Sequence, residues 1–181
     1  MEDNIISLSR NNETQKRKDL LNLLQEWEET VKLAKREKRF LYDGFFPGYF
    51  NTSPKVLFIA REAREQLEND YIQNTIYHFD NPKGDESRFW ERILCMFNII
   101  MNNGVIEDKT SFEIWQSMKR NNIGFASINI SKYINDSENS QTSDKNLIKK
   151  FLSDSKLGTT DYIRKQIEIL DPDILITGNV A

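Results

Sequence analysis

Several polar side chains stand at or directly after the ends of three apolar runs, and their types are suited to chemistry. A carboxylate such as Glu62 can orient or deprotonate a water, and an amide such as Asn129 can hydrogen-bond the edge of a heterocycle. A lysine such as Lys132 can hold a phosphate. Taken singly, each residue is more often structural, so a functional site depends on their convergence. The full set comprises Arg61, Glu62, Asn129, Ser131, Lys132, Thr177 and Asn179.

The three apolar runs predict buried strands whose carboxyl ends bring these side chains together. The run 55–60 is apolar without alternation over most of its length, which is typical of a strand buried on both faces. The second and third runs are 123–130 and 173–177, and helical segments separate all three, which favours parallel pairing in a layered α/β fold. Ligands of open parallel sheets bind outside the carboxyl ends of the strands, so we expect a pocket there. The residues expected to line it are Arg61, Glu62, Asn129 and Asn179.

The remaining patterns predict helices and loops around these strands. Apolar residues recur at helical spacing from about Thr14 to Arg39, so residues 1–40 should form an N-terminal helical segment packed on the domain. Residues 41–54 hold five aromatic side chains among glycines and prolines and predict a packed loop. A polar loop is expected over 135–146. Further helices are expected over 86–103, 111–120, 144–155 and 160–170.

Length and composition indicate one ordinary globular domain over residues 1–181. The chain is 38% hydrophobic and 29% charged, and no apolar run is long enough for a membrane span. A single cysteine, Cys95, and a single histidine, His78, argue against a disulfide framework and against a metal site built by the protein. Phosphate-binding glycine motifs are absent, so we expect no cofactor. With no secretory leader at its start, the chain is expected to be cytoplasmic, and its net charge of −3 counts modestly against a nucleic-acid partner.

Three segments resemble motifs of the uracil-DNA glycosylase superfamily. Residues 55–65, Lys-Val-Leu-Phe-Ile-Ala-Arg-Glu-Ala-Arg-Glu, are similar to a strand that runs into Gly-Glu-Ala-Pro-Gly or Gly-Gln-Asp-Pro. Residues 126–132, Ala-Ser-Ile-Asn-Ile-Ser-Lys, are similar to a strand that ends in Asn-x-x-Lys, and 169–181 resemble the family's proline, apolar strand and Leu-Gly segment. The resemblance implies a three-layer α/β/α fold with a central parallel sheet. It also implies that the strand 55–60 lies between the other two.

The resemblance implies a role for each matching residue. Glu62 takes the position of a water-activating acid, and Asn129 that of the asparagine that hydrogen-bonds a flipped base. Tyr77 or Phe79 would replace the aromatic ring on which that base stacks, and no motif decides between them. Lys132 would contact a phosphate. The implied function is binding of a nucleoside or nucleic-acid base, with hydrolysis of an N-glycosidic bond as its enzymatic form.

Departures from the family pattern leave other functions open. Arg61 and Arg64 replace a glycine and a proline, and the family's last motif, His-Pro-Ser after a fourth strand, has no counterpart before residue 181. The main alternative is therefore a catalytically inactive binding or interaction module that retains the fold. A weaker alternative is an enzyme of the same fold that acts on a substrate other than nucleic acid.

The expected sheet lacks its last strand, which leaves one edge uncovered. Exposed edges invite pairing with another chain. Either a partner completes the sheet, as in a homodimer through this edge, or the natural protein continues past Ala181. The expected partners are thus DNA or a nucleoside and a second copy of the chain, without a membrane or a metal. The sequence does not indicate which base is preferred.

Overall fold

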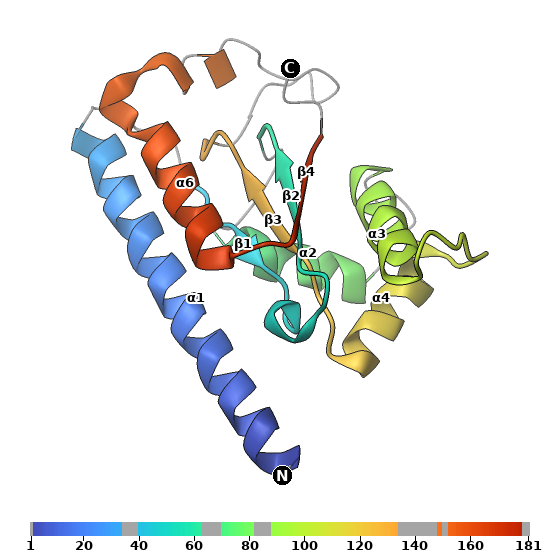
Figure 1. The fold of residues 1–181 in the computed structure, drawn as a ribbon. Helices are drawn as coiled ribbons and strands as arrows, with labels where there is room; N and C mark the ends of the chain where they lie inside the picture. Colours follow the sequence, from blue (N-terminus) through green and yellow to red (C-terminus); the bar gives the residue numbers. More distant parts are fainter. Residues whose placement is uncertain are drawn as a thin grey trace.

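The sheet has four strands in the order β1 (Gly44–Phe45), β3 (Ala126–Asn129), β2 (Val56–Ala60) and β4 (Ile174–Thr177). This arrangement comes from a computed structural model that describes residues 2–33, 40–62, 70–81, 88–133, 148–149 and 152–178, with side chains of the first helix from residue 12 to 31. β2 pairs in parallel with β3 on one side and with β4 on the other. The expected position of the strand 55–60 between the other two is therefore confirmed (Figure 1).

The sheet is mixed rather than wholly parallel, because the short strand β1 pairs antiparallel with β3. The sequence predicts a loop over these residues, and a two-residue strand gives no period by which it could be recognised. The segment around β1 is packed, as expected from its aromatic residues: Phe45, Phe46 and Tyr49 are at most 1% exposed. The loop therefore closes the core beside β3.

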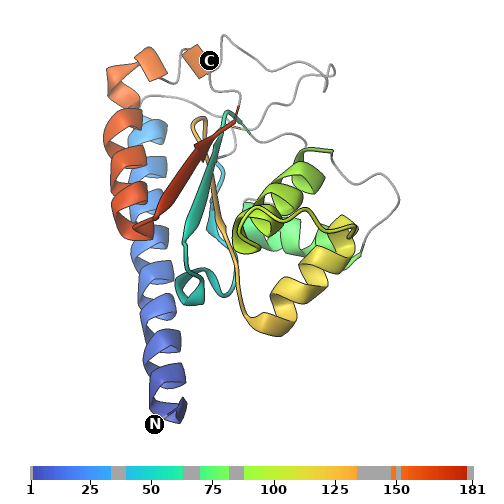
Figure 2. The ribbon, with the colours of Figure 1, turned by 45° about the vertical axis from the view of Figure 1, so that its right-hand side comes forward.

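Helices lie on both faces of the sheet (Figure 2). α1 (Glu2–Leu33) and α6 (Thr159–Leu170) pack side by side on one face. α2 (Tyr71–Asp80), α3 (Arg88–Met101) and α4 (Ser111–Asn121) lie on the other. Two short 3-10 helices, η1 (Tyr49–Asn51) and η2 (Ser155–Leu157), complete the described elements. The structure is thus a mixed α/β fold with an open sheet.

α3, α4 and α6 begin and end near the residues predicted for them. α1 begins at Glu2, well before Thr14, where the apolar periodicity starts, and residues 34–39 lie outside the described part of the chain. α4 begins at a capping box, in which Thr110 and Glu113 exchange side-chain and backbone hydrogen bonds. The predicted loop 135–146 and most of the predicted helix 144–155 also lie outside the described residues.

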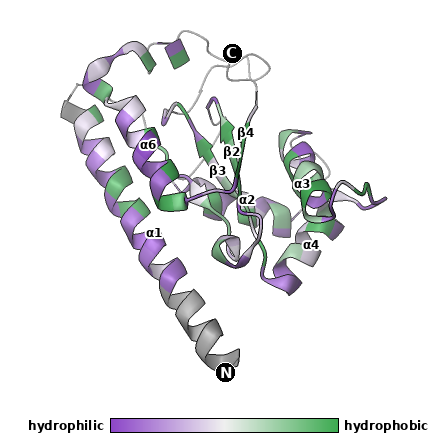
Figure 3. Ribbon diagram, viewed as in Figure 1, coloured by the Kyte–Doolittle hydropathy of each residue, from purple (hydrophilic) through white to green (hydrophobic). Residues whose placement is uncertain are grey.

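Alternation along the strands divides the core into two clusters, one for each face of the sheet. Leu57 and Ile59 of β2 face the cluster under α1 and α6, whereas Val56 and Phe58 face the cluster under α2, α3 and α4. All five residues of β2 are buried, as the unbroken apolar run predicts. β2 and β3 are coloured hydrophobic along most of their length in Figure 3, whereas α1 is mostly hydrophilic. No helix in the described part of the chain is long and apolar enough to cross a membrane.

Trp27 anchors α1 to the core, and its truncation should be among the most destabilising changes in that helix. The side chain is fully buried, stacks on Tyr162 with ring centroids 5.1 Å apart, and donates from Nε1 to the Leu157 carbonyl at 2.7 Å. We expect Trp27→Ala to lower the free energy of unfolding by about 3–5 kcal/mol, measured by chemical denaturation. Leu21→Ala on the same helix is the control, because Leu21 is 45% exposed and its loss should cost less than about 0.5 kcal/mol. Equal effects of the two changes would contradict this account.

Candidate functional site

The carboxyl ends of β2, β3 and β4 meet at one edge of the sheet, as the sequence predicts. Ala60 is the register partner of Asn129, and the backbone N–H of Ser131 donates to the Arg61 carbonyl at 2.8 Å. On the other side, the N–H of Gly178 donates to the Ile59 carbonyl at 3.1 Å. The backbone positions that follow β2 and β3 are therefore held together by hydrogen bonds beyond the strands themselves.

The predicted site residues divide between this edge and other places. Arg61 and Glu62 follow β2 directly and are half-buried, whereas Asn129 is the last residue of β3, Lys132 comes three residues later, and both are fully buried. Asn179 lies outside the described residues, so its expected place in the pocket stays a prediction. The structure thus places at this edge all the predicted strand-end residues that it describes.

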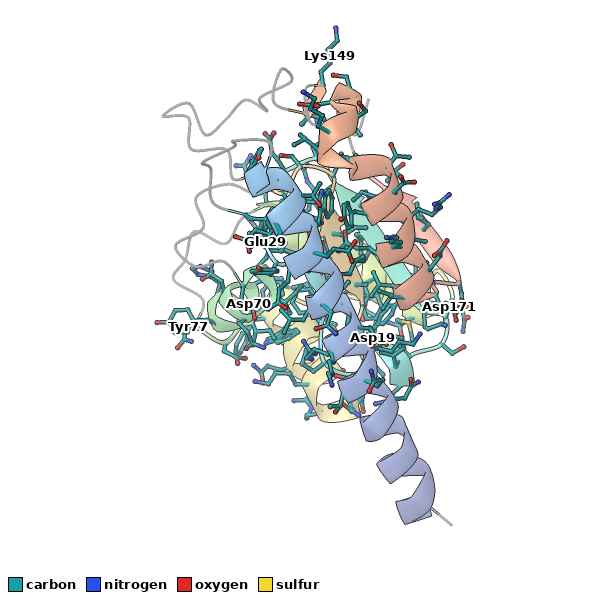
Figure 4. All side chains as sticks on the ribbon, turned by 90° about the vertical axis from the view of Figure 1, so that its left-hand side faces the viewer. Asp19, Glu29, Asp70, Tyr77, Lys149 and Asp171 are labelled. Carbon is teal, nitrogen blue, oxygen red and sulfur yellow. The ribbon has the colours of Figure 1, made fainter. Side chains whose placement is uncertain are left out.

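The two aromatic candidates for base stacking lie elsewhere. Phe79 is 6% exposed and contacts the rings of Trp115 and Trp90, with centroids 5.0 and 5.6 Å away, so it is a core residue rather than a stacking surface. Tyr77 is 57% exposed and points outward from α2 (Figure 4). Tyr71, at the start of α2, lies beside the strand ends. Tyr77 lies more than one helical turn further along the same helix. The expectation that one of these two rings stacks on a base came from the resemblance alone, in which no motif fixes the aromatic position.

Lys132 is used inside the fold. Its Nζ donates to both carboxylate oxygens of Asp43 at 2.7 Å and to the carbonyl of Asn129 at 2.8 Å. The ammonium also lies 5.2 Å from the centroid of the Trp27 ring. Both charged side chains are fully buried. The expected contact between Lys132 and a phosphate is therefore replaced by a buried ion pair, and solvent does not reach this ammonium.

Asp43 connects three parts of the fold at this point. Its Oδ2 accepts from the backbone N–H of Asn129 at 2.6 Å, and its Oδ1 accepts from Nε2 of Gln166 at 3.1 Å. The carboxylate thus joins the segment before β1, the end of β3 and the middle of α6. Each of its oxygens has at least two donors, which is what a buried carboxylate needs. We call Asp43, Tyr71, Asn129, Lys132 and Gln166 the Asp43 cluster.

Burial and the charge of Asp43 set the protonation of the two titratable neighbours in the cluster. Burial lowers the pKa of Lys132, while the attraction of Asp43 acts in the opposite direction. Burial raises the pKa of Tyr71 well above its usual range, and the negative charge of Asp43 adds to this effect. A hydrogen bond between the Tyr71 hydroxyl and the Asn129 side chain opposes the rise. The Tyr71 hydroxyl is therefore neutral at physiological pH.

Three members of the Asp43 cluster were not predicted as site residues. Asp43 stands in an Asp-Gly pair inside an aromatic loop, a context that is typical of turns. Tyr71 follows a stretch without strong periodicity. Gln166 alone carried a usable signal, because it lies four residues from both Tyr162 and Leu170 and so shares their buried face of α6.

Some polar atoms of this region have no protein partner. Within the described residues, Asn129 Oδ1, Ser127 Oγ and Gln166 Oε1 are buried without a hydrogen-bond partner. Most buried polar groups in proteins are paired, so such atoms call for a water or a ligand. Among the side chains that the structure describes, no group of three histidine, cysteine, aspartate or glutamate residues is placed to hold a metal ion.

The Asp43–Lys132 pair should be strongly coupled in stability. Lys132→Met leaves a buried carboxylate without its cation, and Asp43→Asn leaves a buried ammonium without its anion, so each should cost about 3–5 kcal/mol of unfolding free energy. The double variant should cost clearly less than the sum of the two, because it leaves no unpaired charge. The measurement is a double-mutant cycle by chemical denaturation.

A matched surface pair provides the control for this cycle. Arg164 and Asp161 are 3.2 Å apart with side chains 67% and 70% exposed, and the cycle of Asp161→Asn and Arg164→Met should give a coupling under about 0.5 kcal/mol. Additive effects at Asp43 and Lys132 would show that the pair does not hold the site together.

The chain was compared with known proteins in three ways. No protein-family model matches it, no curated protein matches it, and no solved structure matches it.

Proposed function

We propose that the protein binds a nucleobase, in a nucleoside or in a nucleic acid, at the edge of the sheet where β2 and β3 end. We further propose that its architecture is the three-layer α/β/α fold of the uracil-DNA glycosylase type. Two observations support the architecture: β2 lies between β3 and β4 in parallel pairing, and helices cover both faces of the sheet. This is the order that the resemblance of the three motifs implies.

The observation that carries the proposed function is the buried amide oxygen of Asn129. Oδ1 lies at the end of β3, next to the end of β2, and has no hydrogen-bond partner in the described part of the chain. A side-chain amide that recognises a base needs an oxygen without a protein partner, so that the base can donate a hydrogen bond to it. A buried acceptor without a partner costs about 1–3 kcal/mol, so a ligand that donates to it gains affinity.

Glu62 is the carboxylate that can convert binding into hydrolysis. It follows β2 directly and is half-buried, beside the backbone connection between Arg61 and Ser131. A carboxylate at this place can orient a water toward the glycosidic carbon of a bound nucleoside. The enzymatic form of the proposal is therefore release of a free base from a nucleoside or a nucleic acid.

The alternative function is an inactive binding or interaction module. The specific observation in its favour is that Lys132 and Asp43 form an ion pair inside the fold. The buried Lys132 ammonium is therefore not exposed to contact a phosphate. In this alternative, the protein still binds a base but does not cleave its N-glycosidic bond.

Base release separates the two functions. We expect the purified protein to release free base from oligonucleotides that carry uracil or another damaged base, and Glu62→Gln to lower the rate by about 10²-fold or more. The measurement is release of labelled base, together with binding of the same oligonucleotides by fluorescence anisotropy.

Glu168→Gln is the matched control, since Glu168 is 66% exposed on α6 and its loss should leave release unchanged. Binding without release by the unaltered protein would favour the inactive module. The absence of both binding and release would contradict the proposed function.

We also propose that two copies of the chain pair through β4. This strand lies at an edge of the sheet, and its Leu175 is 45% exposed although its register partner Leu57 is fully buried. The four residues of β4, Ile-Leu-Ile-Thr, include none of the charges or prolines with which proteins block edge pairing.

Analytical ultracentrifugation of the unaltered protein and of Leu175→Lys tests the dimer. We expect a dimer at micromolar concentration and a monomer for Leu175→Lys, because an edge lysine opposes strand pairing. Ile106→Lys is the control, since Ile106 is 79% exposed outside the sheet and should leave the dimer intact. A monomeric unaltered protein would refute the proposal.

A further inference from the structure

An apolar strip lies beside β4, on the face of the sheet that carries α2, α3 and α4. It consists of Phe89, Met96 and Ile100 of α3 and of Ile174 and Ile176 of β4, and we call it the α3–β4 strip. Building on the dimer proposed above, we propose that this strip is the main contact between two copies of the chain. In this contact α3 of one copy packs against α3 of the other, beside the paired β4 strands.

The side chains of the strip are apolar and incompletely covered. Phe89 is 39% exposed, Met96 is 38% exposed, and the three isoleucines are half-buried. These isoleucines pack against the core cluster under α2, α3 and α4, so the strip continues that core to the surface. No charged residue belongs to it. Exposed apolar surface that continues a core is typical of a contact with another molecule.

The flank of α3 that carries the strip faces the open edge of β4. Phe89, Met96 and Ile100 share one flank of the helix because they are seven and four residues apart. Trp90 lies on the other flank and contacts Phe79 of α2, with ring centroids 5.6 Å apart. A backbone hydrogen bond of 2.9 Å joins α2 to the segment before β1, at the opposite edge of the sheet. α3 accordingly lies nearest to β4 on this face (Figures 1 and 2).

The backbone of β4 directs hydrogen-bonding groups toward the same open edge. The N–H groups of Ile174 and Gly178 donate to backbone carbonyls of the β2 segment, each at 3.1 Å. Backbone groups of successive residues in a strand point alternately to its two sides. The N–H and C=O groups of Leu175 and Thr177 therefore point away from β2, and β4 is the last strand at this edge of the described sheet.

Pairing of two β4 strands determines where the second α3 lies. Identical strands pair antiparallel about a two-fold axis that is perpendicular to the sheet, which gives the same patch on both copies. Such an axis keeps each face of the sheet on its own side and reverses directions within the plane of the sheet. The two α3 helices therefore lie on one face, antiparallel to each other, with their strips in contact. The two Leu175 side chains meet on the other face.

The length of β4 explains why the strip is needed. The strand has four residues, which extend about 13 Å, and a two-stranded ribbon alone is at best marginally stable in water. Stable dimers bury about 1,200–2,000 Å² of surface in total. Apolar side chains beside the strand must supply most of this area. The described surface around β4 offers the strip on one face and Leu175 on the other.

Glutamate substitutions in the strip test the contact. We expect Phe89→Glu and Met96→Glu each to raise the dissociation constant of the dimer at least about 100-fold, because a charge would be buried between two apolar surfaces. The measurement is sedimentation equilibrium, with circular dichroism to verify that each variant is folded. Phe112→Glu is the matched control, since Phe112 is 40% exposed on α4 outside the strip and its change should alter the constant less than about threefold.

A single reporter cysteine tests the contact without an added charge. Cys95 is the only cysteine of the chain, so Cys95→Ser combined with Met96→Cys places one thiol on the strip, and Cys95→Ser combined with Phe112→Cys places it on the control surface. Labelling of a thiol requires access to it. We expect the labelling rate at position 96 to fall at least about tenfold as the protein concentration rises through the dissociation constant, and the rate at position 112 to stay constant.

Two results would overturn the strip as the contact and leave pairing through β4 standing. One is an equal effect of glutamate at Phe89 and at Phe112 in a protein that is dimeric. The other is a labelling rate at position 96 that does not depend on protein concentration although the dimer forms. An unaltered protein that stays monomeric would refute the proposed dimer and the strip together, and nucleobase binding would be unaffected by that result.

Discussion

The buried ion pair between Asp43 and Lys132 is the constraint on which the region around the strand ends depends. Two opposite charges without solvent exposure are tolerated only when their own donors and acceptors are satisfied, and the Asp43 carboxylate and the Lys132 ammonium meet that condition. The hydrogen bonds of the Asp43 carboxylate connect the loop before β1, the end of β3 and the middle of α6. The backbone of Asn129 is therefore held in place by hydrogen bonds to both buried charges.

The parts of the fold that sequence reasoning found are those governed by apolar periodicity. The unbroken run of β2 predicted a strand buried on both faces, and the spacing of apolar residues predicted α3, α4 and α6 close to their observed bounds. The order of the three parallel strands followed from the resemblance. β1 was missed because two residues carry no period, and apolar periodicity marks α1 only from about Thr14, because its first turns are polar.

The candidate site was predicted only in part, for a physical reason. The adjacency of the strand ends follows from parallel topology, so Glu62 and Asn129 could be placed at one edge. Burial of a charge, by contrast, depends on a partner distant in sequence: Asp43 lies far along the chain from Lys132, and nothing local marks either residue as paired. Lys132 was therefore read as an exposed cation, and Phe79 as an accessible ring. Tertiary packing decides both cases.

The tryptophans make the two faces of the sheet optically distinct. Trp27 belongs to the cluster beneath α1 and α6 and lies against the Lys132 ammonium, whereas Trp90 and Trp115 belong to the cluster on the opposite face. These are the three tryptophans of the chain. Fluorescence from a form that retains Trp27 alone would report on the layer that contains the ion pair, and a form that retains the other two would report on the second layer. The order in which the layers come apart during unfolding can thus be followed without an added label.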